Sequence, residues 1–251
     1  QSVYGACILN NIFKSFIPKR ISNKTVIRFY DLFRKLSGVS DRVIATHKEA
    51  NRAVLSDAQI SPLKEEPGYI ENQREWKEVL IGKGKNPTMQ KSGCGVFAVY
   101  NALLALGEDV GKETLPELIA AFEKQGVVLS GRWGVSPRAI YRYFQNNGFD
   151  TCMTMSRDTE VINRIGKDYT VNIVTVYNNK EDIMQFVHTV CVTKNERGEY
   201  FAHNAYYRKG NTYIAMPLGE KGFTGLQETI EHLAKNPQAI CVIGINKRSF
   251  L

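Results

Sequence analysis

The chain of 251 residues lacks several patterns that identify common protein classes. It has no apolar run near the roughly 20 residues that a membrane-spanning helix needs. It also has no GxxxxGK[ST] phosphate loop, GxGxxG turn or HExxH pair. Its five cysteines show no CxxC spacing, which argues against a zinc site and against a dense disulfide framework. We therefore expect no metal and no cofactor, and a cytoplasmic or membrane-associated protein rather than a disulfide-rich secreted one.

Positive charge is concentrated at the start of the chain. Residues 1–55 hold ten Lys or Arg against three Asp or Glu, a net +7 of the total +8. Basic residues that bind nucleic acid would be expected around the working site, so we expect no nucleic-acid partner. A basic arm over 1–55 can instead contact a membrane surface, an acidic partner or an acidic face of its own domain, or be a solvated helical face. We favour docking at a membrane surface over a shielding pro-segment.

Helical patterns fill the first part of the chain and strand patterns the second, which is typical of an α+β fold. The helix expected over 96–106 (VFAVYNALLAL) is apolar almost all round, so we expect it to be buried. Residues 56–72 read as an extended connector. The sequence predicts helices over 25–36, 41–55, 96–106, 114–124, 136–148, 158–166 and 225–234, and strands over 169–177, 187–194, 199–205, 211–217 and 239–246.

The sharpest candidate for chemistry is Cys94, which lies between two glycines at the start of the buried helix. Unpaired N–H groups and the helix dipole at such a position favour a thiolate. The flanking glycines leave room in the turn and let a substrate approach the sulfur. The N–H of Cys94 would supply half of an oxyanion hole. The other cysteines (Cys7, Cys152, Cys191 and Cys241) are expected to be core or partly buried thiols.

A cysteine nucleophile needs an acid–base partner, and two histidines on neighbouring predicted strands offer one. His188 lies on the strand 187–194, and Asn204 lies on the next, where it can fix the tautomer of the imidazole. His203 competes for the role of base. If the hairpin closes with two residues, paired positions sum to 393 and His203 shares a side with His188. If it closes with three residues or a bulge, we expect them to sum to 392 so that His188 faces Asn204, and Gly198 after an Asn-Glu-Arg turn favours this form.

Gln90, the glycine-flanked Cys94, the apolar helix after it, and the strands carrying His188 and Asn204 occur in a characteristic order. In this order they resemble the papain-like cysteine peptidases, within them the group of the bacterial peptidases that cut after double-glycine leaders. The resemblance covers about residues 86–246. It implies a papain-like domain over 86–251, with a helical first half packed on an antiparallel sheet, preceded by a basic helical extension and connector over 1–85. It also implies a Cys94–His188–Asn204 triad with the Gln90 side chain as second oxyanion donor.

The predicted activity is hydrolysis of a peptide or isopeptide bond by a thiol nucleophile, with a peptide or protein as substrate. Two alternatives use the same pocket. One is transfer of the acyl group to an amine by the same triad. The other is a peptide-binding module without catalysis.

Overall fold

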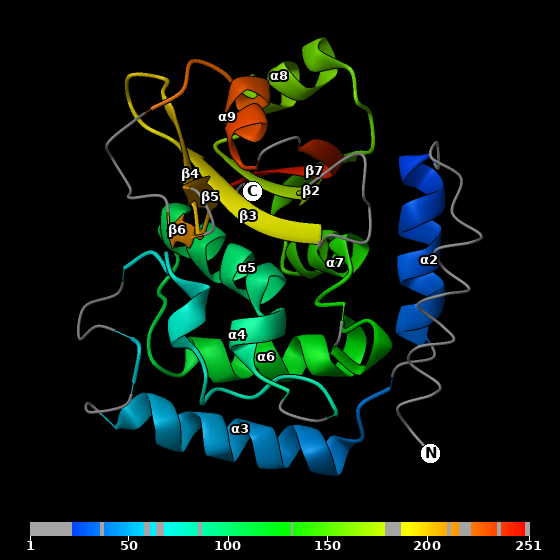
Figure 1. The fold of residues 1–251 in the computed structure, drawn as a ribbon, viewed down its shortest axis with the longest axis vertical. Helices are drawn as coiled ribbons and strands as arrows, with labels where there is room; N and C mark the ends of the chain where they lie inside the picture. Colours follow the sequence, from blue (N-terminus) through cyan, green and yellow to red (C-terminus); the bar gives the residue numbers. More distant parts are fainter. Residues whose placement is uncertain are drawn as a thin grey trace.

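The computed structural model describes residues 22–35, 38–57, 61–63, 68–84, 87–131, 133–178, 187–209, 212–215, 222–234 and 237–248. Cys7 and the apolar stretch at 8–17 lie outside these residues. Within them the chain is α+β, with eight α-helices and a five-stranded antiparallel sheet (Figure 1). No described helix combines the length and apolarity that crossing a membrane requires.

The sheet has the strand order β1-β7-β2-β3-β4, and each strand runs antiparallel to its neighbours. Helix α5 packs on one face, against β2 and β3, while α8 and α9 pack on the other (Figure 1). Because both faces are covered, every residue of β2 is buried. Its sequence, VNIVTVY, is accordingly mostly apolar on both faces, with Asn172 and Thr175 as the exceptions. The strands are β1 (Asp150–Thr154), β2 (Val171–Tyr177), β3 (Val187–Lys194), β4 (Tyr200–His203), β5 (Tyr206–Lys209), β6 (Thr212–Ala215) and β7 (Gln238–Asn246).

The helices confirm most of the expected positions. The expected buried helix is α5, in which residues 95–103 are all buried. The helices are α2 (Asn23–Lys35), α3 (Asp41–Ser56), α4 (Met89–Ser92), α5 (Cys94–Ala105), α6 (Thr114–Gln125), α7 (Pro137–Asn146), α8 (Thr159–Asp168) and α9 (Leu226–His232), with 3-10 turns η1 (Gln73–Glu75) and η2 (Leu129–Gly131).

Four features of the strands differ from the prediction, and the first is β5, which lies between two predicted strands and was not expected. Strand β1 was not expected, because its sequence DTCMT has no apolar alternation, and it is held by pairing with β7. The residues expected to form a strand over 211–217 contribute β6, which pairs with β5 in a separate two-stranded sheet. The predicted strand 199–205 is shorter, since β4 ends at His203.

Both expected registers of the β3–β4 hairpin are wrong. The pairs run from Cys191↔His203 to Lys194↔Tyr200, so paired positions sum to 394. The turn itself has the favoured three-residue form, in which Asn195 N donates to Glu199 O and Gly198 adopts a φ of +80°. A turn of this length pairs residue 195 with residue 199, so the sum is 394 and not 392. His188 therefore lies beyond the paired part of β4 and has no direct cross-strand partner on it.

The described part of residues 22–84 shares one hydrophobic core with the rest of the chain. Ile27 of α2, Leu55 of α3, and Trp76 and Ile81 are nearly inaccessible and belong to the same cluster as the buried residues of α5. The Asn23 side chain of α2 also donates to the carbonyls of Met155 and Ala239. The domain boundary expected at residue 85 stays a prediction, but this packing joins the two sides of it.

The connector is fastened to α5 by one buried side chain. Asn101 is fully buried, its Oδ1 accepts from Ile70 N at 2.8 Å, and its Nδ2 donates to Ile70 O at 3.0 Å. Both polar groups of the Ile70 backbone are thus satisfied by one amide. Residues 68–76 consequently run alongside α5 toward the end of β4.

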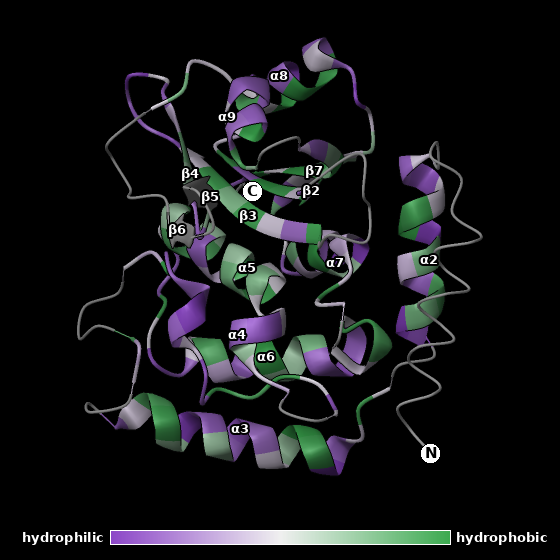
Figure 2. Cartoon of the chain, viewed as in Figure 1, coloured by the Kyte–Doolittle hydropathy of each residue, from purple (hydrophilic) through white to green (hydrophobic). Residues whose placement is uncertain are grey.

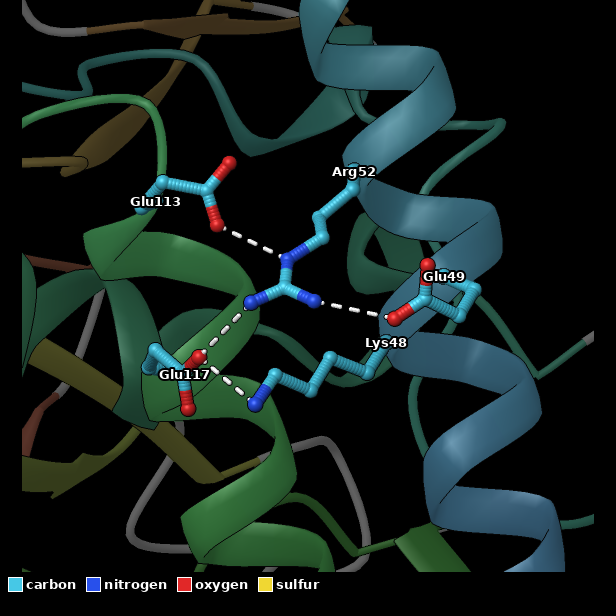
Figure 3. Close-up of polar contacts among 5 residues, drawn as sticks. All are labelled: Lys48, Glu49, Arg52, Glu113 and Glu117. Atoms are coloured by element: carbon cyan, nitrogen blue, oxygen red, sulfur yellow. Dashed lines mark hydrogen bonds and ion pairs between the residues drawn. The ribbon is translucent and has the colours of Figure 1, made fainter.

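The basic residues of α3 face acidic residues of the chain itself. Helix α3 alternates hydrophobic and hydrophilic residues along its length (Figure 2) and packs on α6. On its polar side Arg52 contacts Glu49, Glu113 and Glu117, and Lys48 lies 2.6 Å from Glu117 (Figure 3). One alternative from the charge pattern was contact with an acidic face of the same domain. Lys48 and Arg52 of α3 make such a contact.

Candidate active site

Cys94 is the first residue of α5 and is half-buried. Its flanking glycines are required by packing within the protein. A Cβ at Gly93 would lie 2.6 Å from Met89 O and 2.9 Å from a ring carbon of Phe97, and a Cβ at Gly95 would lie 2.9 Å from Val135 Cβ. Such contacts are too close for any larger residue. The glycines thus let α4, α5 and the chain around Val135 close around the cysteine.

Several donors converge on the sulfur of Cys94. The side chain of His188 and the backbone N–H groups of Thr189 and Gly95 hydrogen-bond to it. Burial by itself raises the pKa of the thiol. The hydrogen bond and charge of His188, with the two N–H groups, outweigh burial and bring the pKa of Cys94 below its usual value. The site therefore favours a thiolate.

The second nitrogen of His188 is held by the main chain. His188 Nε2 lies 2.7 Å from the carbonyl oxygen of Asn204. A carbonyl only accepts, so Nε2 carries a hydrogen and Nδ1 is the nitrogen left for Cys94. Burial lowers the pKa of His188, but the hydrogen bond and charge of Cys94, followed by the bond to Asn204, raise it above the usual value overall. The opposite shifts bring the pKa values of the two groups closer together.

Asn204 meets His188 as expected, but the contact described here uses its main-chain carbonyl. The residue directly follows β4 and has a φ of +56°, in the left-handed region that asparagine tolerates better than most residues. Its side chain is bonded to Gln73, with Oδ1 accepting from Gln73 N at 3.1 Å and Nδ2 donating to Gln73 Oε1 at 3.2 Å. We expected the side-chain amide of Asn204 to orient His188. The structure corrects this, because the hydrogen bond to His188 Nε2 comes from the main-chain carbonyl.

Gln90 lies on α4, one turn before Cys94. Its side-chain Nε2 donates to the main-chain carbonyl of Arg74 at 2.9 Å. Its main-chain carbonyl accepts from Gln73 Nε2 at 2.9 Å. One hydrogen of its amide is thus committed to the backbone of the η1 turn. The expected role of Gln90 in an oxyanion hole stays a prediction.

His203, the competing base, is tied into a different set of contacts. It is 1% exposed, its Nδ1 lies 2.8 Å from Glu71 Oε1, and its Nε2 lies 2.8 Å from Thr193 Oγ1. Its ring also packs on Tyr69, with centroids 3.8 Å apart. The hydrogen bond to the Cys94 sulfur comes from His188, so of these two histidines it is His188 that contacts the cysteine.

Aromatic residues from distant parts of the chain surround the cysteine. Tyr30 of α2 is close enough for the charge of Cys94 to raise its pKa, although burial is the larger cause. Trp133 packs against Tyr30 and Phe33 of the same helix, with centroids 6.1 and 5.8 Å apart. A Cβ on the adjacent Gly134 would lie 3.9 Å from the Cys94 sulfur. The loop after η2 therefore borders the thiol, and α2 covers that loop.

The remaining described cysteines do not share this environment. Cys191 and Cys241 are buried, and burial raises the pKa of both thiols. Cys152 is half-buried like Cys94, but its pKa is raised, first by burial. Among the described residues, no group of three or more His, Cys, Asp or Glu is placed to hold a metal ion.

Two residues at the site, Glu71 and Gln73, were not predicted from the sequence. Both lie in or just after the connector, more than 130 residues from Asn204, which each of them contacts. Nothing in the local pattern of a Pro- and Gly-containing connector indicates a tertiary contact of this range. The one available signal is a run of polar residues, Glu71-Asn-Gln73, in front of the buried Trp76.

Comparison of the chain with models of protein families, with curated proteins and with solved structures finds no match.

Proposed function

We propose that this chain is a papain-like thiol hydrolase that cleaves a peptide or isopeptide bond with Cys94 as nucleophile and His188 as acid and base. The observation that carries the proposal is the hydrogen-bonded Cys94–His188 pair at the start of α5, with a lowered thiol pKa and a raised imidazole pKa. Perturbed pairs of this kind are typical of functional sites. The order of a cysteine helix, further helices and then a histidine strand in an antiparallel sheet also supports the papain-like assignment.

In the first half of the reaction, the Cys94 thiolate attacks the carbonyl carbon of the substrate. The new C–S bond forms as the carbonyl oxygen takes the negative charge. When the C–N bond breaks, the imidazolium of His188 gives its Nδ1 proton to the leaving amine. The Nε2–H stays on the Asn204 carbonyl throughout and keeps the ring in place.

In the second half, neutral His188 removes a proton from water, which attacks the thioester carbonyl. Breaking the C–S bond releases the carboxylic acid product and returns Cys94 to the thiolate paired with imidazolium. The N–H of Cys94 lies in the first turn of α5, where backbone N–H groups have no carbonyl four residues back in the helix. We assign this N–H to the oxyanion, with the remaining amide hydrogen of Gln90 as the second donor.

A direct test incubates the protein with a mixture of peptides from a digested proteome and identifies new termini by mass spectrometry. We expect new cleavage products from the wild-type protein and none from Cys94→Ala, which keeps the helix start because alanine is tolerated there. Isopeptide-linked peptides are included as a second substrate set. Absence of Cys94-dependent cleavage in both sets would contradict the proposal.

The same assay distinguishes the two alternatives. With hydroxylamine added, an acyl-enzyme is diverted to hydroxamates in either enzyme. Products that form only when an amine is present would identify an acyltransferase. Peptides retained by the protein without Cys94-dependent turnover would identify a binding module.

A further inference from the structure

The segment from Tyr69 to Trp76, called the 69–76 strap below, precedes Cys94 by about 20 residues. It carries two residues that hold Asn204. Glu71 Oε2 accepts from Asn204 N at 3.0 Å, and Gln73 pairs with the Asn204 side chain through both its backbone N–H and its Oε1. Asn204 is 1% exposed. Its backbone and its side chain are thus both fixed from the strap.

These contacts matter because Asn204 has an unusual backbone. A φ of +56° is disfavoured for residues other than glycine and persists where the surroundings over-determine it. The turn at Asn204 directs its carbonyl to His188 Nε2, although β4 has already ended. If Asn204 relaxed to an extended conformation, its carbonyl would turn away and His188 would lose this hydrogen bond.

Glu71 also fixes the residue before Asn204. Its other oxygen, Oε1, lies 2.8 Å from His203 Nδ1, while His203 Nε2 reaches Thr193 on β3. One carboxylate therefore accepts from two successive residues at the end of β4. The two bonds end on different oxygens, so an amide in the same orientation, with one oxygen and one NH2 group, accepts only one of them.

The strap is itself held firmly on both sides of Glu71. Asn101 of α5 bonds both polar groups of Ile70, and Trp76 is 2% exposed in the core against Phe97 of α5. Because Cys94 begins the same helix, α5 sets the position of the nucleophile and, through the strap, that of Asn204. The nucleophile and the support of its base thus share one rigid element.

We infer that Glu71 is a positioning residue of the proposed hydrolase: by accepting from Asn204 N and His203 Nδ1, it holds the Asn204 carbonyl against His188 Nε2. Gln73 assists through the Asn204 side chain. Glu71 contacts neither the substrate nor the reacting atoms and acts through Asn204 and His188. The inference rests on the proposed function, because it assigns a role within that site.

The test measures iodoacetamide labelling of Cys94 against pH in the full chain, with Glu71→Gln as the variant and Glu78→Gln as its control. Glu78 is exposed and lies two residues after the strap. Both changes remove one negative charge. A weaker bond to the Asn204 carbonyl destabilises the imidazolium and with it the thiolate. We expect the pH midpoint of labelling in Glu71→Gln to rise by roughly half to one unit, which lowers labelling about three- to tenfold at pH values below the wild-type midpoint. Glu78→Gln should match wild type.

A second readout separates positioning from loss of charge. In the wild type, nitrogen NMR of His188 should show an Nε2–H protected from exchange by the Asn204 carbonyl. We expect Glu71→Gln to lose this protection from exchange. If the variant acted only by removing a negative charge near the site, the pH midpoint would shift but the Nε2–H would stay protected. If Glu71→Gln does not fold, Gln73→Met supplies a second variant, with a smaller shift in the same direction.

The outcomes for the two ideas are distinct. A wild-type Cys94 that labels only at the pH of an ordinary thiol would overturn the proposed function. A low-pH midpoint in the wild type that neither Glu71→Gln nor Gln73→Met shifts, with Nε2–H still protected, would overturn the role of Glu71 alone.

Discussion

The Nε2 atom of His188 lies 2.7 Å from the main-chain carbonyl oxygen of Asn204, sixteen residues further along the chain. The side chain of Asn204 meanwhile pairs with Gln73. A base oriented by a main-chain carbonyl depends on the backbone conformation of its partner more than on the partner's side chain. This relationship makes the effect of substitutions at residue 204 predictable.

Asn204→Gly and Asn204→Val should therefore differ. Glycine adopts a φ near +56° without strain and keeps the carbonyl, whereas a β-branched residue is a true outlier there. We expect Asn204→Gly to retain Cys94 labelling at neutral pH within about threefold, and Asn204→Val to lose roughly tenfold or more, as for the loss of a hydrogen bond to a charged group. Circular dichroism checks that both variants fold. Equal, severe losses in both would show that the amide side chain orients His188.

Gly93→Ala should destabilise the fold. A Cβ there meets Met89 O at 2.6 Å and Phe97 at 2.9 Å, in a tightly packed turn that has little room to relax. We expect a loss of about 1–3 kcal/mol in the free energy of unfolding, measured with urea. Gly111→Ala is the control, because no atom lies within 4 Å of its added Cβ, and it should stay within about 0.5 kcal/mol of wild type. An unchanged Gly93→Ala would mean that α4 shifts freely.

Contact with a membrane surface should depend on α2 rather than on α3. Lys48 and Arg52 of α3 face the acids of α6 (Figure 3), whereas Lys24 and Arg28 of α2 are exposed beside Phe29 and Leu32. We expect Lys24→Gln with Arg28→Gln to weaken sedimentation with phosphatidylserine vesicles at low salt about tenfold.

The control for this change is Arg164→Gln with Lys167→Gln, which removes the same charge from α8. These two residues are exposed and lie on α8, which packs beside α9 on the face of the sheet opposite α5 (Figure 1). The control should keep vesicle binding. Equal weakening by both double variants would indicate a nonspecific effect of net charge, and no weakening by either would contradict docking through α2.

Much of this site was predictable from residue type, because the sequence itself carries the relevant chemistry. Cys94 between glycines before an apolar helix, and His188 on a later strand, follow from local pattern, and the buried α5 follows from its apolar surroundings. The role of the Asn204 main chain was not predictable, since it depends on one positive φ just after the end of β4. Glu71 and Gln73 were missed because their partners lie on the other side of the fold.

Strand β1 was missed for a related reason. Its residues have little intrinsic strand pattern, and the sheet extends to it through β7, which runs nearly a hundred residues later. The turn of the β3–β4 hairpin was expected, but the register assigned to it was wrong, because a three-residue turn pairs residue 195 with residue 199 and every later pair follows from that one. Chemistry-bearing residues can thus be read from the sequence here, whereas the backbone that aims them cannot.

The most direct test of the account compares the iodoacetamide labelling rates of Cys94 and Cys152 between pH 5 and 10, peptide by peptide, by mass spectrometry. Both cysteines are half-buried, but the pKa of Cys94 is lowered and that of Cys152 is raised. A lowered pKa places the rise in thiolate at lower pH, so Cys94 should label fast near pH 7 while Cys152 labels only at alkaline pH. His188→Ala should move the Cys94 curve to higher pH. If Cys94 labels no faster than Cys152 at pH 7, or if His188→Ala leaves its curve in place, the thiolate–imidazolium pair does not exist and the proposed mechanism is wrong.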